Sequence, residues 1–311
     1  MNHGLKPIYT CYLSSCLFVD CIHSPRSQSS LCSRGFAPLP SRCILKSIGY
    51  ILFGGYMNIS MTWQQWLNTP NKPPVFFMLN SLAEPNPVAP FYSNDWVEQA
   101  FPLYSGTPMD HLLKCSPWLI QPKLNSLSII GHWLDSHSLS DNSWGWAYRS
   151  DDSWSQQLNH WRSRQQVILQ EKQVILRSMD PRVLSQLLPA MITSDWSAFL
   201  TPVSELMIDL PEPQLYFRPE NCGQDGSERP FVLGSHLSYA WHHSDYALRG
   251  MAFAIWNDLW EDHGELAMKL DEPEGILQEK IIHWLKEYRK DKGKISNLTS
   301  ADYLQTLNEN G

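Results

Sequence analysis

His242, His243 and Asp245 form the strongest grouping of side chains that could do chemistry. Imidazoles and a carboxylate can transfer protons or bind a metal ion, and His236 and the acidic segment 261–263 are the nearest groups that could support them. Adjacent histidines on a helix point in different directions, whereas a helical metal site uses ligands four residues apart. We therefore expect surface or partly buried histidines, with a hydrolase-like enzyme as the alternative.

A second candidate is Asp180, which lies between Arg177 and Arg182 in the sequence. A carboxylate between two guanidinium groups could orient a substrate. However, an aspartate immediately before a proline, here Pro181, is typical of a helix N-cap, and nearby arginines most often form structural ion pairs. We therefore expect this block to fix a junction between elements.

Motifs of the common enzyme classes are absent from the sequence. It contains no Gly-x-Ser-x-Gly elbow, no phosphate-binding glycine-rich loop, no dinucleotide fingerprint and no Cys-x-x-Cys pair. His132 and His137 are five residues apart, which does not suit two ligands on one helical face. We expect no metal, no cofactor and no catalytic residue, and hence a protein that is not an enzyme.

The composition predicts a globular protein that binds other proteins. The chain has 311 residues, 43% of them hydrophobic, which can bury the core of one large domain or two small ones. Its formal net charge is −7, and the first 56 residues hold five of the 24 basic residues but one of the 31 acidic ones. The remaining chain is therefore strongly acidic, which argues against binding to nucleic acid or to an anionic membrane surface.

The first 56 residues differ in composition from the rest, and three interpretations compete. A lipoprotein-like signal around Leu13-Ser14-Ser15-Cys16 has only a short, interrupted apolar stretch. A disulfide-bonded or metal-binding module is the second interpretation, but the spacing of its cysteines is irregular, which argues against it. We favour translated upstream sequence, because Gly54-Gly55 could be encoded by a ribosome-binding purine run that serves a start at Met57 or Met61. The cysteines concerned are Cys11, Cys16, Cys21, Cys32 and Cys43.

From Met61 onward, short strands and helices are expected to alternate. The five apolar residues at 75–79 predict a strand buried on both faces. Three prolines predict an extended loop, and no helix, over residues 84–95. Thr107 and Pro108 are suited to the N-cap and first position of a short helix, and residues 118–120 predict a brief strand between two prolines.

Residues 144–188 have the most regular pattern. Trp154, Leu158 and Trp161 recur at the spacing of one helical face. The predicted elements are a strand at 144–148, a helix from 151 or 152, a hairpin pairing 167–169 with 174–176 around a turn near Glu171-Lys172, and a helix capped by Asp180.

Apolar spacing becomes helical after a possible strand at residues 215–217. Predicted helices cover residues 248–260, residues from about 271 with a stop at Gly293, and residues 297–308. The first helix has one apolar stripe suited to a core. Its second stripe, Phe253, Trp256 and Trp260, suits either a core or a groove for a partner segment.

These elements predict an α+β fold with two lobes. Residues 57–205 would form a mixed α/β lobe with a small sheet, residues 206–311 a mainly helical lobe that binds cargo, and residues 1–56 a non-native or disordered extension.

Several short blocks occur in a distinctive order within residues 75–205. They are Pro102-Leu103-Tyr104, Pro117-Trp118-Leu119, Trp144-Gly145-Trp146, His160-Trp161-Arg162 and Arg177-Ser178-Met179-Asp180-Pro181-Arg182. In this order they resemble the effector adaptor/chaperone domain family of type VI secretion systems. The chain departs from the family at Asn80, where an aspartate is common, at Ser178-Met179 and at the turn Glu171-Lys172.

The resemblance implies a cytoplasmic adaptor of a Gram-negative bacterium. Such a protein binds the N-terminal region of one effector and loads it onto the VgrG spike, without catalysis, cofactor, nucleic acid or integral membrane segment. The lobe after residue 204 would select the cargo, and large aromatic side chains supply contact area at low entropic cost. The candidate contact residues are Trp241, Phe253, Trp256, Trp260 and Trp284. A further alternative is an immunity protein that blocks a toxin.

Overall fold

The computed structural model describes residues 58–136, 138–210, 212–223, 229–292, 295 and 298–310. The expectations for residues 1–57 and for Gly293 lie outside these residues. The described chain divides into two compact units, one that ends at Leu233 and one that begins at Gly234. The strands at residues 205–209 and 213–217 belong to a sheet of the first unit, so the boundary between the units lies later in the sequence than the expected 205/206.

A seven-stranded antiparallel sheet organises the first unit, in the order β1-β9-β8-β5-β2-β4-β3. Its strands are β1 (Asn58–Ser60), β2 (Val75–Asn80), β3 (Val97–Pro102), β4 (Pro117–Pro122), β5 (Gly145–Arg149), β8 (Glu205–Asp209) and β9 (Pro213–Phe217). The sheet is larger than the small one expected from sequence, because β1 has only three residues and β3 is partly polar, so that each gives little signal alone. The α+β class is confirmed.

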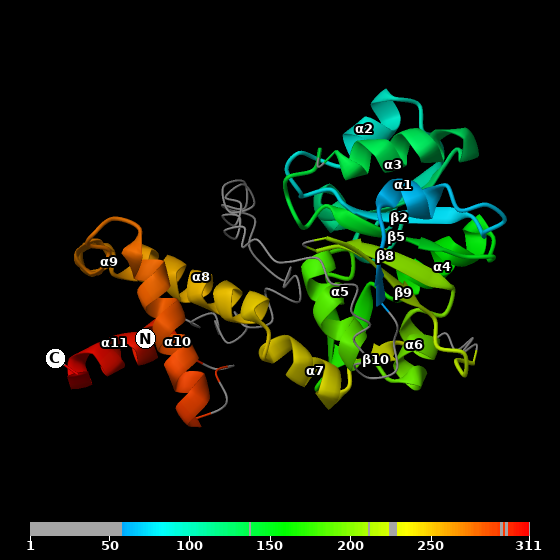
Figure 1. Cartoon of the computed structure of the whole chain (residues 1–311). Helices are drawn as coiled ribbons and strands as arrows, with labels where there is room; N and C mark the ends of the chain where they lie inside the picture. Colours follow the sequence, from blue (N-terminus) through cyan, green and yellow to red (C-terminus); the bar gives the residue numbers. More distant parts are fainter. Residues whose placement is uncertain are drawn as a thin grey trace. The chain divides into compact units, whose positions relative to one another are not determined.

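Strand β2 is the centre of this sheet, and all six of its residues are buried. Phe77 pairs with Ile120 of β4 on one side and with Ala147 of β5 on the other. The prediction of a strand buried on both faces is thus confirmed, since helices cover both sides of the sheet (Figure 1).

One face of the sheet is covered by α1 (Trp63–Leu67), α2 (Val88–Ser93) and α3 (Leu127–Asp135), which follows the short 3-10 helix η2 (Leu124–Ser126) (Figure 1). Asp135 ties two of these helices together, because its carboxylate accepts the backbone N–H groups of Trp63 at 2.8 Å and Gln64 at 2.9 Å. The carboxylate satisfies two donors that the first turn of α1 leaves without intrahelical partners. Trp63 and Trp66 are at most 1% exposed.

The other face carries α4 (Trp154–Ser163), α5 (Pro181–Leu187), the 3-10 helix η3 (Leu188–Ala190) and α6 (Thr193–Phe199) (Figure 1). A second sheet of three strands, β10 (Phe231–Val232), β6 (Gln166–Leu169) and β7 (Lys172–Ile175), belongs to the same unit. β6 and β7 form the expected hairpin, whose turn residues Gln170 and Glu171 have φ values of 48° and 66°.

The second unit is helical in its described part. It comprises α7 (Ser235–His242), α8 (Asp245–Asp262), α9 (Gly264–Leu270), α10 (Ile276–Lys292) and α11 (Ser300–Asn310). The first apolar stripe of α8 is buried as predicted, and it packs against Leu277, Ile281 and Leu285 of α10. This core belongs to the second unit and contains no residue of the sheet.

Two local predictions were wrong. Residues 88–93 form helix α2, although a loop was expected there; Pro87 is its N-cap and Pro90 lies in its first turn, where the N–H that proline lacks would have no intrahelical acceptor. The helix expected to start at Pro108 is the 3-10 helix η1 (Asp110–Cys115), whose N-cap position is held by Met109; Thr107 instead accepts the N–H of Met109 at 3.1 Å. Within the described residues, no helix has the length and apolar character required to cross a membrane.

Candidate functional site

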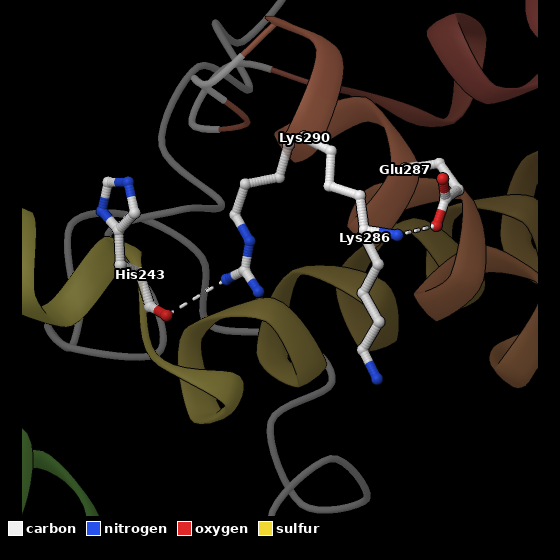
Figure 2. Close-up of a pocket in the computed structure, with 5 residues that line it drawn as sticks. His243, Lys286, Glu287 and Lys290 are labelled. Carbon is white, nitrogen blue, oxygen red and sulfur yellow. Dashed lines mark hydrogen bonds and ion pairs between the residues drawn. The ribbon is translucent and has the colours of Figure 1, made fainter.

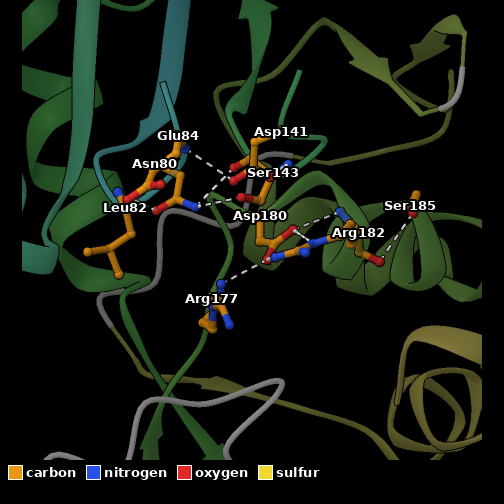
Figure 3. Close-up of polar contacts among 9 residues, drawn as sticks. All are labelled: Asn80, Leu82, Glu84, Asp141, Ser143, Arg177, Asp180, Arg182 and Ser185. Atoms are coloured by element: carbon orange, nitrogen blue, oxygen red, sulfur yellow. Dashed lines mark hydrogen bonds and ion pairs between the residues drawn. The ribbon is translucent and has the colours of Figure 1, made fainter. Parts of the chain in front are cut away.

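The Arg177–Arg182 block is a closed charged junction at the start of α5. Asp180 is 2% exposed, and its Oδ1 accepts the N–H of Arg182 at 3.0 Å, which makes it the helix N-cap. Arg177 contacts Oδ2 at 3.0 Å and Arg182 contacts it at 2.7 Å (Figure 3). With the backbone bond and both guanidinium groups in place, the carboxylate is fully used within the chain. The expected structural role fits this geometry.

A buried network of aromatic and polar side chains lies between the sheet and α4. Trp161 donates its indole N–H to Tyr148 Oη at 2.6 Å, and this hydroxyl donates to Gln157 at 2.7 Å. Burial raises the pKa of Tyr148 well above its ordinary value. Trp146 donates to the carbonyl oxygen of Ser178 at 2.8 Å, so β5 holds the segment that leads to Asp180.

Residues of the His160–Arg162 block anchor α4 to other segments of the same unit. Arg162 donates to the carbonyl oxygen of Ser105 and lies 5.0 Å above the ring of Phe101. His160 Nε2 lies 3.0 Å from the carbonyl oxygen of Phe199. Burial, reinforced by the nearby Arg164, lowers the pKa of His160 to about 4, although its hydrogen bond to Phe199 acts in the opposite direction.

The remaining blocks join the sheet edge to η1. The N–H of Leu103 donates to the carbonyl oxygen of Pro117 at 2.9 Å, and the N–H of Tyr104 donates to Ser116 Oγ at 3.0 Å. Pro102 pairs with Trp118 in the β3–β4 ladder. Segments that are separate in the sequence are therefore neighbours in the fold.

Asn80 shows why an amide can replace the aspartate that is common in the resembling family. Its Nδ2 donates to the carbonyl oxygen of Ser143 at 3.0 Å and lies 3.2 Å from Ser143 Oγ, while its Oδ1 accepts from Leu82 N–H at 3.1 Å (Figure 3). An ionised aspartate has no donor for the Ser143 carbonyl oxygen. Asn80 is 1% exposed. In this buried position its amide group supplies the hydrogen-bond donor that the carbonyl oxygen of Ser143 needs.

Sequence reasoning missed the buried cluster around Glu205. Arg149 Nε lies 3.1 Å from Glu205 Oε1, with side-chain exposures of 3% and 7%, in an ion pair that is not aligned as a hydrogen bond. Glu205 also accepts from Trp66 Nε1 at 2.9 Å and from Lys72 at 3.1 Å. Burial lowers the pKa of Arg149, and Glu205 partly offsets that shift. Charged residues at the end of β5 and the start of β8 were the available sequence signal.

The histidine grouping is not assembled as a catalytic site. His242 Nδ1 lies 2.6 Å from the carbonyl oxygen of Ser238, and His243 Nδ1 lies 2.9 Å from that of Tyr239, four residues earlier in each case. Neither imidazole contacts Asp245, whose carboxylate instead lies 4.0 Å from Arg289. Across the residues that the structure describes, no three His, Cys, Asp or Glu side chains lie close enough together to hold a metal ion.

Most of the candidate contact residues are partly buried aromatics in the helical unit. Phe253 and Trp256 stack with ring centroids 5.7 Å apart, and Trp260 follows at 6.1 Å from Trp256. Trp284 packs on Tyr303 at 5.2 Å. Trp241, in contrast, is 3% exposed and offers no surface to a partner.

Comparisons with known proteins found a similarity for one part of the chain. No curated protein and no solved structure matches the sequence. The family model described as "Domain of unknown function (DUF4123)" matches residues 75–198. This range contains each of the short blocks from Pro102 to Arg182, together with Asn80, and excludes the helical unit. Residues 75–198 of this chain are therefore similar to a DUF4123 domain.

Proposed function

We propose that this protein is a non-enzymatic adaptor that binds a type VI secretion effector and loads it onto the VgrG spike. The observation that carries the proposal is the DUF4123 match over residues 75–198, which is a domain associated with effector adaptors of these systems. The match covers the region whose ordered blocks resemble the adaptor family. The adaptor would act in the cytoplasm, before secretion.

The arrangement of the matched residues supports a structural role for them. Asp180, Arg162 and Trp161 each direct their polar groups at other groups of the same unit, with Asp180 at 2% and Trp161 at 0% exposure. The carboxylate of Asp180 and the indole N–H of Trp161 are therefore engaged within the unit, and neither could take part in proton transfer without breaking these contacts. The binding surfaces of the adaptor would therefore lie outside these blocks.

The helical unit is the proposed cargo-binding lobe. It lies outside the DUF4123 match, and α8 carries three partly buried aromatic side chains in succession, Phe253, Trp256 and Trp260. Aromatic side chains with part of their area accessible are typical anchors of protein interfaces. The N-terminal region of an effector is the proposed ligand.

Affinity purification tests this function. The chain, tagged at its C-terminus and expressed from its own gene, should retain one effector and a VgrG protein that mass spectrometry identifies. Trp256→Ala should reduce the recovered effector several-fold without changing the elution volume of the folded protein, because it removes a large part of an anchor. Tyr92→Ala, which removes a 51% exposed aromatic from the first unit, is the matched control and should leave recovery unchanged.

The outcomes separate the adaptor from its alternatives. Neutralisation of a toxin without recovery of a spike protein would instead support an immunity protein. A hydrolytic activity that is lost in His242→Ala or Asp245→Ala, with binding retained, would support the hydrolase-like enzyme. Recovery of neither an effector nor a spike protein would overturn the proposal.

A further inference from the structure

A basic hollow lies within the helical unit, between the α7–α8 junction and the second half of α10. Its volume is about 360 Å³, and it is lined by His243, Lys286, Glu287, Arg289 and Lys290 (Figure 2). We propose that this hollow binds an acidic stretch of the partner polypeptide. The inference rests on the proposed function, because it gives the chemistry of the segment that the cargo-binding lobe would recognise.

Arg289 forms the fixed wall of the hollow. Its Nη1 donates to the carbonyl oxygen of His243 at 3.1 Å, and its Nη2 lies 4.0 Å from the exposed carboxylate of Asp245. The side chain is 22% exposed, so it is mostly buried and keeps part of its surface accessible. These contacts connect α10 to the α7–α8 junction, on the opposite side of the hollow.

Lys286 is the cation available to a ligand. It is exposed, and it forms no hydrogen bond or ion pair with any other residue that the structure describes. Neutralisation of the helix dipole accounts for cations in the last turn of a helix. Lys286 lies before the last turn of α10, which ends at Lys292, so the dipole does not account for it.

Lys290 can exchange its present partner for a ligand carboxylate. It contacts Glu287 Oε1 at 2.6 Å, and both side chains are well exposed, at 70% and 49%. The hydrogen bond from Lys290 lowers the pKa of Glu287, so this carboxylate stays ionised at neutral pH. An exposed ion pair three residues apart on a helix contributes little free energy to stability. Lys290 can therefore leave Glu287 and pair with a carboxylate of the ligand at little cost in free energy.

Charge favours an acidic polypeptide over other ligands. The cations Lys286, Arg289 and Lys290 outnumber the acidic groups at the hollow, Glu287 and Asp245, which leaves it with a positive balance. The whole chain has a net charge of −7, so its overall charge opposes the approach of an acidic segment. A positive hollow in an acidic protein would set the position and direction in which that segment binds. Tyr239 is 63% exposed, and its ring stacks on the ring of His243 with centroids 3.7 Å apart. It adds an aromatic surface beside the hollow.

Fluorescence anisotropy on the purified full chain tests the inference. A fluorescein-labelled deca-glutamate peptide should bind in low salt and weaken as salt rises, whereas a deca-glutamine peptide should not bind. The double variant Lys286→Gln/Lys290→Gln should weaken binding about tenfold. The matched control Lys172→Gln/Lys269→Gln removes two exposed lysines outside the hollow and should change the affinity less than about twofold.

Equal loss in both double variants, or no binding to wild type, would overturn the inference. Vesicles that contain phosphatidylserine are the competing ligand, and binding to them in place of the peptide would also overturn it. The two proposals can fail separately. If wild type and the Lys286→Gln/Lys290→Gln variant recover the effector equally, the proposed role of the hollow is contradicted and the adaptor function is not. Peptide binding at the hollow, without recovery of effector or VgrG, contradicts the proposed adaptor function and leaves the proposed ligand of the hollow standing.

Discussion

Arg149 and Glu205 form an ion pair at 3.1 Å in the interior of the first unit, where their side chains are 3% and 7% exposed. Arg149 also donates to the carbonyl oxygens of Trp66 at 2.6 Å and Pro73 at 2.8 Å. The pair therefore connects β5 and β8 to α1 and to the chain before β2. Removing one partner would leave the other charge buried and uncompensated.

Glu205→Gln should accordingly lower the free energy of unfolding by about 3–5 kcal/mol. Urea denaturation followed by tryptophan fluorescence measures this change. The double variant Arg149→Met/Glu205→Leu, which removes both charges, should lose less stability than Glu205→Gln. A double variant that is less stable than the single one would show that the hydrogen bonds of Arg149, and not the buried charge, dominate.

Asp180→Ala should destabilise the first unit by about 2–4 kcal/mol, because the N-cap of α5 and the partner of two arginines are lost together. Asp180→Asn keeps an oxygen for the Arg182 N–H and should cost less. The control is Asp95→Asn, whose side chain is 88% exposed although it contacts Lys123 at 2.7 Å. That change should cost at most about 1 kcal/mol in the same denaturation assay, and equal losses at the two positions would contradict the account of Asp180.

His160 should make stability depend on pH between about 4 and its unfolded value near 6.5. Its pKa is lowered in the fold, so in this window the unfolded chain binds the proton and the folded chain does not. Stability is complete above the unfolded pKa, falls as pH drops toward 4, and the total loss is at most about 3 kcal/mol.

Denaturation of His160→Gln across this pH range checks the assignment. The variant should show a flatter profile than wild type, since its side chain does not titrate. Substitution of the exposed His111 by Gln is the control and should preserve the wild-type slope. An unchanged slope in His160→Gln would assign the pH dependence to another group.

Gly145→Ala should reduce stability by about 3 kcal/mol or more. Gly145 has φ of +142°, and a Cβ at this position would overlap the carbonyl oxygen of Met78 and lie 3.0 Å from the Cα of Leu79. Both obstacles are backbone atoms of β2, which cannot move without breaking the sheet. Gly264→Ala, where a Cβ meets nothing within 4 Å, should leave the thermal midpoint almost unchanged.

Local patterns predicted several elements correctly because their causes are local. Five apolar residues specified β2, and Asp180 followed by Pro181 specified the start of α5. The spacing of Leu248, Met251 and Ile255 identified the buried stripe of α8. Such features depend on neighbours within a few residues, so they can be read from one sequence.

Helix α2 and the size of the sheet could not be read in this way. Pro90 breaks a helix interior but is tolerated in a first turn, and which case applies depends on where packing begins the helix. Strand β1 becomes a strand through hydrogen bonds to β9, far away in the sequence, and β8 pairs with the distant β5 as well as with its neighbour β9. Pairing over such distances leaves a weak local pattern.

The sequence by itself determined the α+β class, the acidic balance and the order of the blocks that resemble an adaptor domain. Only the tertiary structure decided how those blocks are used, because burial and hydrogen bonding depend on neighbours that folding brings together. It enclosed Asp180 between two arginines, paired Arg149 with Glu205, and left His242 and His243 bonded to their own helix. It also gathered Lys286, Arg289 and Lys290 around one hollow, since a helix face acquires an opposite wall only through packing.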